Sequence, residues 1–450
     1  MLYVCWGFPP SRGSGVFRGL ATANALAAEG FRVTVITADR ETFIRHTGVD
    51  LALEERVDAS IQIIRVPFEW PTKAQELGEW TLERVKDPDG WLANWADACL
   101  ATFPEPRYGA WAPRIVEAAE ELHQRNPIEL VVTTANPNVA GLVGAHLYEK
   151  YGIPHVLDQR DAWTLNVLTD EIDFPEGTPV AQMEARLVAS ASELWYVNQP
   201  IRDWYAATYP ASADRMHVVM NGYDASFAPA AQLTPSDPEK PLVFGYVGTI
   251  SSAVPLAETL DAWLTAREMS PEIAQASAEF WGHLGFFVDP LEITRKLLAS
   301  AAPYGVDYRG PVSKVDVPAT YSTFDVLLFL AGRGKYVTSG KILEYMATGL
   351  PIVSVHEPDI AATSVLRDYP LWHPVADLAP DTIAEALVAA AHSARTASPE
   401  TRRACVAHAA KYARTEQFRE PLARIHALLG DKGGPGSQQS PASERQEGVA

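Results

Sequence analysis

The chain has 450 residues, of which 47% are hydrophobic, and a formal net charge of −19 at pH 7. This length suits two globular domains, and the acidic balance argues against a general nucleic-acid binder or a protein held on anionic lipid by charge. No signal segment stands at the N-terminus, and no stretch approaches 18 uninterrupted apolar residues. We therefore expect a cytoplasmic protein without an integral membrane segment, for which peripheral membrane contact stays open.

The cysteine and histidine patterns give no sign of a disulfide framework or a metal site. Cys5, Cys99 and Cys405 are odd in number and widely separated, which is typical of reduced core thiols in a cytosolic protein. No CxxC or HExxH pattern occurs, and the eleven histidines are scattered. We expect no metal and no tightly bound cofactor.

The first half of the chain alternates predicted strands with predicted helices. A strand over residues 2–8 is followed by a polar glycine loop at 9–15, a helix over 16–29 and a second strand over 31–37. This order predicts a right-handed crossover and a parallel sheet buried on both faces. Further strands are predicted at 61–67, 130–134, 155–157, 194–197 and 216–219.

A tryptophan-rich stretch interrupts this pattern between residues 68 and 125. We expect helices and loops inserted over one face of the domain, with the aromatic rings used mainly for packing, although a lid or an acceptor wall stays open. The stretch contains a DxD pattern at Asp87 and Asp89, which resembles a metal-binding motif; Gly90 follows, so we expect a turn. The tryptophans are Trp70, Trp80, Trp91, Trp95 and Trp111.

A second α/β unit begins near residue 242, after a Pro- and Ala-rich connector at 227–240. Its predicted strands are 242–247, 278–281, 306–309, 326–329, 351–355 and 372–375, and helices over 382–394 and 399–429 close the fold. We expect an α/β fold of two doubly wound Rossmann-like domains facing each other across a cleft. The expected divisions are a first domain at 1–225, a second at 226–395, helices at 396–429 that return toward the first domain, and a disordered tail at 430–450.

Residues 336–353, YVTSGKILEYMATGLPIV, are the most informative stretch of the second domain. Ser339 and Gly340 begin a short predicted helix, so unpaired N–H groups and the Lys341 ammonium meet in one small volume that attracts phosphate. Glu344 lies one turn on, where its carboxylate could accept two ribose hydroxyls. The alternative is a capped surface helix with a local Lys–Glu pair. The glycine spacing does not fit a P-loop, which argues against a Walker-type ATP site.

Polar side chains also follow two predicted strands of the first domain. Asp158, Arg160 and Asp161 in LDQRDAW could orient a substrate hydroxyl or contact a phosphate, or they could form a structural group with the arginine held between two carboxylates. Asn136 and Asn138 in TANPNVAG are similarly placed, and a helix-capping role is their alternative.

In this order the motifs resemble those of glycosyltransferases with the GT-B fold, in particular the retaining group called family 4. The resemblance spans nearly the whole ordered chain. It is carried by FPPSRGSGVFRGLATANALAAEGFRVTVITA, GIPHVLDQRDAW, VVMNGYDASF, FGYVGTI and SGKILEYMATGLPIV.

The resemblance implies transfer of a sugar from a nucleotide diphosphate donor, with retention at the anomeric carbon and without a metal. Glu344 matches the family glutamate that holds the donor ribose. Other matching positions are the diphosphate loop Ser339, Gly340 and Lys341, the N-terminal loop Gly13, Ser14 and Gly15, and the donor-domain loop Gly248 and Thr249. The implied partners are a nucleotide sugar and a glycan, lipid-linked or small-molecule acceptor.

The sequence departs from the family pattern at two places. The Arg and Lys pair that commonly follows the loop of Gly248 is absent, and no cation occurs before Arg267. The first family glutamate is replaced by Tyr336. As compensating cations we consider Lys341, Arg333 and Lys335.

Two other functions stay open on the residues alone. Gly13, Gly15 and Gly19 with Asp39 approximate a dinucleotide site, which would indicate an NAD-dependent oxidoreductase, although the last glycine spacing is one residue too long. The missing Arg and Lys pair is also compatible with a relative that binds sugar nucleotides without catalysis.

Overall fold

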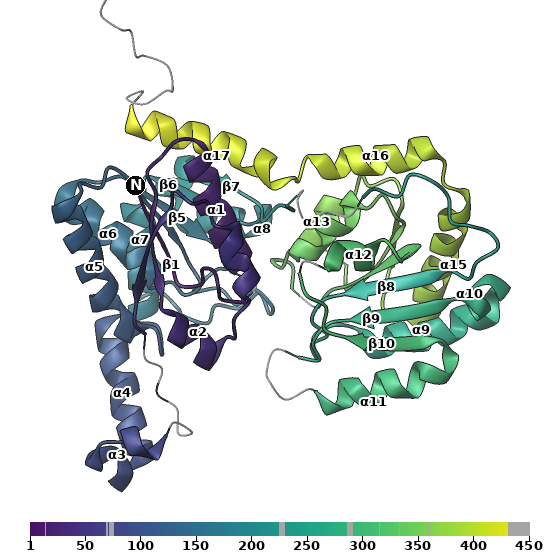
Figure 1. Ribbon diagram of the computed structural model, residues 1–450, viewed down its shortest axis with the longest axis horizontal. Helices are drawn as coiled ribbons and strands as arrows, with labels where there is room; N and C mark the ends of the chain where they lie inside the picture. The colour runs from purple at the N-terminus through teal and green to yellow at the C-terminus, as the bar shows by residue number, and fades with distance from the viewer. Residues whose placement is uncertain are drawn as a thin grey trace, which may run out of the picture.

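The computed structural model describes residues 1–13, 15–68, 71, 76–224, 230–285, 291–314, 316–332, 334–358 and 360–430. The chain forms two α/β domains that lie side by side, with two C-terminal helices running along both of them (Figure 1). The expected division at residue 225 and all but the first residue of the expected tail at 430–450 fall outside the described residues.

The first domain is built on a parallel sheet of seven described strands in the order β3-β2-β1-β4-β5-β6-β7. Strands β1, β2, β4 and β5 are buried along their whole length, as the apolar runs in the sequence predict. The strands are β1 Leu2–Cys5, β2 Thr34–Ala38, β3 Gln62–Val66, β4 Val131–Thr134, β5 His155–Gln159, β6 Glu193–Tyr196 and β7 Met216–Val218.

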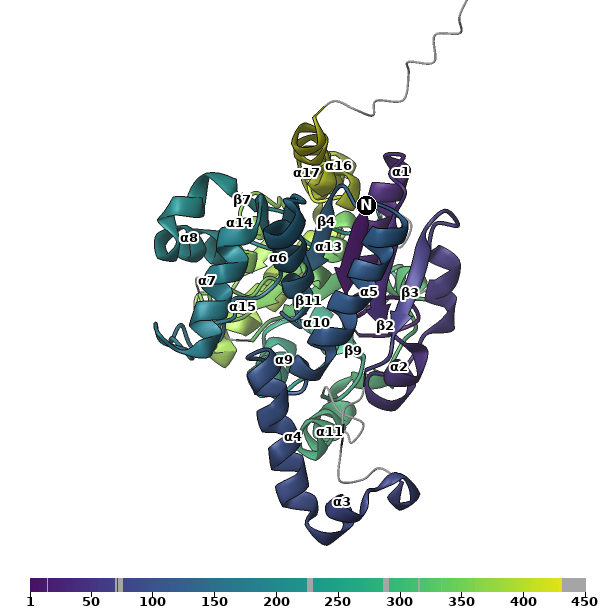
Figure 2. The ribbon, with the colours of Figure 1, turned by 90° about the vertical axis from the view of Figure 1, so that its left-hand side faces the viewer.

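Helices cover both faces of this sheet, and one pair projects away from it. The helices are α1 Val16–Ala28, α2 Arg40–His46, α3 Leu82–Lys86, α4 Pro88–Thr102, α5 Ala112–Arg125, α6 Ala140–Tyr151, α7 Pro179–Ser190 and α8 Gln199–Thr208. In Figures 1 and 2, α3 and α4 form an arm that extends beyond the domain. The predicted turn at Asp87 is instead a helix cap, because its carboxylate accepts from the Gly90 N–H at the start of α4.

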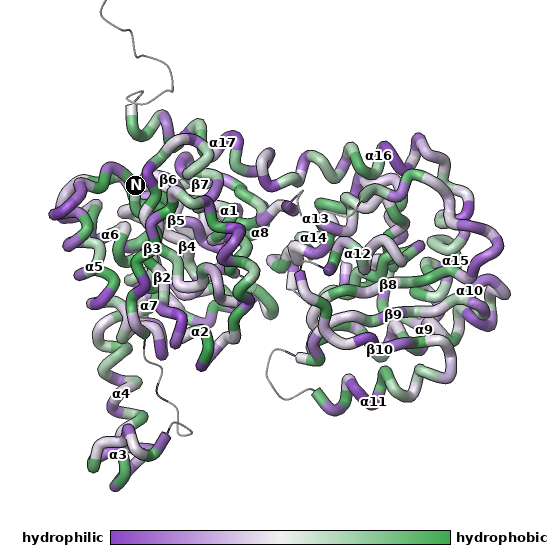
Figure 3. Tube along the Cα trace, viewed as in Figure 1, coloured by the Kyte–Doolittle hydropathy of each residue, from purple (hydrophilic) through white to green (hydrophobic). Residues whose placement is uncertain are grey.

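The second domain repeats this architecture with six described strands in the order β10-β9-β8-β11-β12-β13, all parallel. The strands are β8 Val243–Val247, β9 Ser277–Trp281, β10 Val306–Gly310, β11 Val326–Leu330, β12 Ile352–Val355 and β13 Trp372–Pro374. The helices are α9 Leu256–Met269, α10 Pro271–Gln275, α11 Glu292–Ala301, α12 Val317–Tyr321, α13 Gly340–Ala347, α14 Ala361–Leu366 and α15 Pro380–Thr396. Hydrophilic and hydrophobic residues alternate along α11, whereas the interior strand β8 is mainly hydrophobic (Figure 3).

The predicted helix over 399–429 is wrong in one respect, because the structure has two helices there, α16 Pro399–Ala410 and α17 Arg414–Leu429. The break is fixed by a bridge to the first domain: the Tyr223 N–H donates to the Tyr412 carbonyl, and the Arg414 N–H donates to the Tyr223 carbonyl. As a result α16 packs on α13 of the second domain and α17 packs on α1 of the first.

The remaining differences lie at element ends. The first strand ends at Cys5 and not at residue 8, and the second begins at Thr34 and not at residue 31. All three cysteines are buried and free. Among the helices of the described ranges, none combines the length and apolarity needed to cross a bilayer.

Candidate functional site

A cavity of about 60 Å³ opens where strands β1, β4 and β5 of the first sheet end, which is the edge at which open α/β domains bind ligands. Its lining includes Gly7, Ser11, Gly13, Gly15, Asn136 and Arg160. The sequence-predicted residues Gly13, Gly15, Asn136 and Arg160 are therefore brought together. A cavity of about 70 Å³ near Met1 contains none of the predicted site residues.

The start of α1 forms one wall of this cavity. Gly15 occupies the N-cap position and no side chain caps this helix, so its first N–H groups lack a side-chain acceptor, although the Val16 N–H donates to the Gly13 carbonyl at 2.9 Å. A Cβ on Gly15 would lie 2.5 Å from Nη1 of Arg160, so only glycine allows the guanidinium to lie this close. Among the described residues, Arg160 has no hydrogen bond or ion pair, which leaves its donors available to an anion. Ser14 lies outside the described residues.

The loop after β4 is fixed by a polar network that ends at Glu105, a half-buried glutamate. The Asn136 amide donates to the Asp161 carboxylate, and Gln159 Nε2 donates to the Asp161 carbonyl at 3.0 Å. Asn138 accepts from the same Gln159 amide at 2.9 Å and donates to Glu105 at 3.2 Å. Asn138 is therefore structural, whereas Asn136 is exposed at the cavity.

Glu105 holds the beginning of α6. Its carboxylate accepts from the backbone N–H groups of Asn138 at 3.0 Å and Val139 at 2.9 Å. Burial raises the pKa of Glu105 to about 7, against the opposing effect of these hydrogen bonds. The tryptophan-rich insertion, which contributes Glu105, thus supports the loop that carries Asn136.

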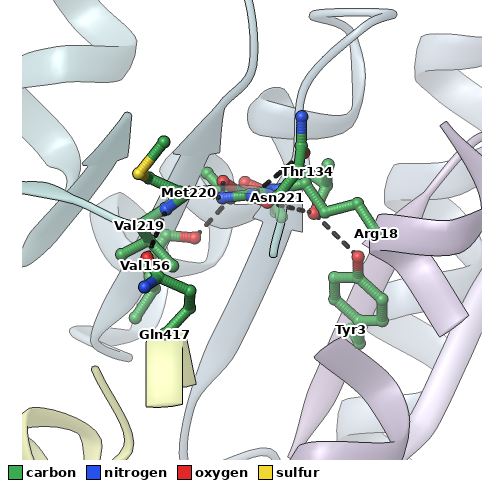
Figure 4. A network of polar contacts seen from close by, with 10 residues as sticks. Tyr3, Arg18, Thr134, Val156, Val219, Met220, Asn221 and Gln417 are labelled. Atoms are coloured by element: carbon green, nitrogen blue, oxygen red, sulfur yellow. Dashed lines mark hydrogen bonds and ion pairs between the residues drawn. The ribbon is translucent and has the colours of Figure 1, made fainter. Parts of the chain in front are cut away.

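Asp158 was expected beside the cavity, but the structure buries it beneath. The side chain has 0% exposure, and both carboxylate oxygens accept from Arg18, at 2.7 Å from Nε and 2.5 Å from Nη2. Thr134 also donates to Asp158 at 2.9 Å. The arginine held by this carboxylate is therefore Arg18 and not Arg160. Arg18 also reaches the Val219 carbonyl and Asn221, so the ion pair ties α1 to the chain leaving the domain (Figure 4).

In the second domain, the start of α13 presents open backbone groups as predicted. Ser339 is the N-cap residue without a side-chain cap bond, and a Cβ on Gly340 would meet no atom within 4 Å. The Lys341 ammonium donates to Tyr246 Oη at 2.9 Å and lies 4.4 Å from that ring. Burial lowers the pKa of Lys341 to about 8, with Glu344 acting in the opposite direction.

The loop after β8 closes over this lysine. Gly248 has φ +145°, a conformation that L residues rarely adopt, and a Cβ there would collide with the Lys341 side chain. Thr249 follows in the same loop and accepts from Tyr246 Oη through its carbonyl at 2.8 Å. Gly248, Thr249 and Lys341 therefore form one cluster.

Glu344 does not form the local pair with Lys341 that the sequence left open. Its carboxylate binds the Lys314 ammonium through one oxygen and the Tyr321 hydroxyl, at 3.0 Å, through the other. The Lys314 ammonium also lies 5.5 Å from the ring of Phe17, two residues after Gly15 in the first domain. Glu344 and the start of α1 thus face each other across the two domains.

The structure also locates the predicted compensating cations and the aspartate of the alternative dinucleotide site. Lys335 pairs with Asp170 of the first domain, and Arg333 lies outside the described residues. Asp39 caps α2 by accepting from the Thr42 N–H at 2.9 Å, so it is not the free ribose-binding acid of a dinucleotide site.

Sequence reasoning missed Lys314, Tyr321 and Tyr246. The position of Lys314 in the loop after β10 was the one available signal, since such loops converge at the carboxyl edge of the sheet.

Two parallel α/β domains with polar loops at the carboxyl ends of their strands define the GT-B class of fold. Residues 18–222 match the family model of the glycosyl transferase 4-like domain. The chain therefore has the GT-B fold, and residues 18–222 of its N-terminal domain are similar to the glycosyl transferase 4-like domain.

Solved structures agree with this fold. A glycosyltransferase from Rickettsia africae is 12% identical, with 96% of this chain and 98% of that chain covered and a TM-score of 0.63. Sucrose-phosphate synthase from Thermosynechococcus elongatus is 15% identical, with 96% and 99% covered and a TM-score of 0.62. Anabaena HepE in complex with UDP-glucose is 14% identical, with 95% and 99% covered and a TM-score of 0.60. No curated protein sequence matches the chain.

Proposed function

We propose that the protein transfers a hexosyl group from a nucleoside diphosphate donor to an acceptor hydroxyl, with retention and without a metal. The observation that carries this proposal is the pairing of two half-sites. The half-site of the second domain is the start of α13 with Lys341 and Glu344, and that of the first domain is the start of α1 with Gly15 and Arg160. Lys314 connects them, because its ammonium binds Glu344 and lies over the ring of Phe17. In this proposal the second domain holds the donor and the first holds the acceptor.

The C-terminal half-site suits a nucleoside diphosphate. Each Glu344 oxygen retains a lone pair beyond its bond to Lys314 or Tyr321, so the carboxylate can accept ribose hydroxyls. The free N–H groups at Ser339 and Gly340, together with the Lys341 ammonium, suit the diphosphate. Uridine donors are the first to test, because the similar HepE structure holds UDP-glucose.

The N-terminal half-site suits the transferred sugar and the acceptor. Gly13 and Gly15 permit close approach of a sugar to the backbone, and Arg160 supplies the cation that the sequence lacks after Gly248. Asn136 and Asp161 are the polar groups proposed to orient the acceptor hydroxyl. Asp158 acts only through Arg18, as a positioning residue.

The reaction proceeds on one face of the sugar. The bond between the anomeric carbon and the phosphate oxygen breaks with its electron pair leaving on the diphosphate, while the acceptor oxygen bonds to the same carbon. The acceptor proton passes to a donor phosphate oxygen. Lys341 and Arg160 stabilise the negative charge that grows on the leaving group, which is the contribution that a metal makes elsewhere. Activity should therefore persist in EDTA. We also propose that the reaction takes place in the cytoplasm.

A thermal-shift screen of nucleoside diphosphates, their sugar conjugates and NAD tests the donor class. A ligand at 100 times its Kd stabilises the native state by about 2.7 kcal/mol, and each kcal/mol raises Tm by roughly 2–4 °C in a domain of 150–250 residues. We expect a shift with one nucleoside diphosphate and a loss of at least half of it in Glu344→Gln. Glu268→Gln, an exposed change on α9, is the matched control.

Two results of this screen would contradict the proposal. A shift with NAD and with no nucleoside diphosphate would favour the oxidoreductase. A nucleoside diphosphate shift without transfer from its sugar conjugate to any of a broad panel of acceptors would instead favour a binding-only relative.

A further inference from the structure

Asn198 connects the two domains at a point that neither half-site uses. It follows β6 and caps α8, where its Oδ1 accepts from the Ile201 N–H at 3.0 Å. The other end of the same amide leaves the first domain: Nδ2 donates to the Tyr336 carbonyl at 2.6 Å and to Thr338 Oγ1 at 3.2 Å. Asn198 is only 3% exposed, so both of its ends are engaged away from solvent.

The segment that Asn198 binds leads directly into the start of α13. We name residues 334–339 the donor segment, since Gly340 and Lys341 follow it. Tyr336 is 5% exposed, and its ring packs within the hydrophobic core of the first domain, although the residue belongs to the second. Its hydroxyl donates to Asp170 at 2.6 Å, and Lys335 pairs with the same carboxylate.

The contacts differ in strength. Asp170 and Lys335 are about half exposed, with 49% of each side chain accessible, so solvent weakens their ion pair. The Asn198 amide and the Tyr336 carbonyl lie in buried surroundings, where removal of a donor leaves an acceptor without a partner. The buried amide is therefore the contact that should control the donor segment.

We infer that Asn198 is a positioning residue that holds the donor segment against the first domain and so sets the geometry at the start of α13. The inference rests on the proposed function, in which that helix start receives the donor diphosphate. It also accounts for Tyr336, which stands where the resembling family has a glutamate: in this chain the position anchors one domain to the other.

Asn198→Asp tests the inference selectively. Asp caps helices as well as Asn does, so the bond to the Ile201 N–H is kept, while both N–H donors are lost and a carboxylate faces the Tyr336 carbonyl. We expect kcat/KM for the nucleotide sugar to fall by roughly 10- to 100-fold. Without any ligand, amide exchange over residues 334–345 should become at least 10-fold faster, while α8 keeps its protection.

The controls separate this inference from the proposed function. Asp87→Asn, an equivalent cap exchange on the arm helix α4, should change neither readout. Thr338→Val removes only the weaker contact and leaves the cap of α8 in place. For this variant we expect a 2- to 5-fold fall in kcat/KM and a 2- to 5-fold faster exchange over residues 334–345, which can be measured even if Asn198→Asp fails to fold. Unchanged exchange over 334–345 in Asn198→Asp, or in Thr338→Val where only that variant folds, would overturn the inference. A wild-type protein that binds no nucleotide sugar would overturn only the proposed function.

Discussion

Lys341 is a half-buried cation whose pKa is lowered to about 8 by desolvation. Its ammonium has Tyr246 as its hydrogen-bond partner among the described residues, and the loop of Gly248 covers it. A diphosphate would provide the missing acceptors and would compensate the desolvation that lowers the pKa to about 8. The side chain is therefore prepared for an anion rather than held by a carboxylate.

The affinity for a nucleoside diphosphate should fall as pH rises through 8. The lysine charge is present below its pKa of about 8 and lost above it, whereas the diphosphate keeps its charge over this range. Between pH 7 and 9.5 we expect Kd, measured by calorimetry, to rise roughly 10- to 100-fold. Lys341→Met, which removes the charge at all pH values, should bind weakly with a flat profile. A flat profile in the wild type would show that this lysine does not contact the ligand.

At the level of elements, the tryptophan-rich insertion and α6 are coupled through the Glu105 carboxylate, which follows the arm helix α4. Glu105→Ala would leave the backbone N–H groups of Asn138 and Val139 buried without acceptors. The expected loss in the free energy of unfolding is about 1–3 kcal/mol, measured by urea denaturation. Glu121→Ala, an exposed change on α5, should cost no more than about 0.5 kcal/mol. Equal stability of the two variants would mean that Glu105 does not hold α6.

Local patterns were sufficient to predict the strands of both sheets and the helices α1, α13 and α15. Continuous apolar runs predicted the buried strands β1 and β4, and the helix-starting residues Ser339 and Gly340 predicted α13. The break between α16 and α17 was missed because it depends on a bridge to Tyr223, almost 200 residues earlier in the chain. Sequence periodicity carries no information about such a contact.

The same limit applies to the candidate site. Residue type and position in the sequence predicted that Gly15, Arg160, Lys341 and Gly248 lie in loops after strands. In the structure Gly15 lies beside Arg160, and Gly248 lies beside Lys341. The sequence did not show which ion pairs form, because Asp158 pairs with Arg18 of α1 and not with the nearby Arg160. Likewise Glu344 pairs with Lys314, which lies 30 residues earlier in the chain, and not with Lys341 one turn before it.

At the scale of the whole molecule, the two domains are joined in separate places around the proposed site. The helices α16 and α17 cross from one domain to the other, Asn198 binds the donor segment, and Lys314 lies over Phe17. A donor bound at the start of α13 would therefore affect the position of α1. This arrangement suits an enzyme that closes around its substrates and excludes water as a competing acceptor.

The most direct measurement is hydrogen exchange with and without the nucleotide sugar that the thermal-shift screen selects. We expect protection of two segments that are more than 300 residues apart, 339–344 at the start of α13 and 15–18 at the start of α1. The nucleoside diphosphate alone should protect mainly the first. Protection elsewhere, with both segments unchanged by the nucleotide sugar, would contradict a donor site shared by the two helix starts.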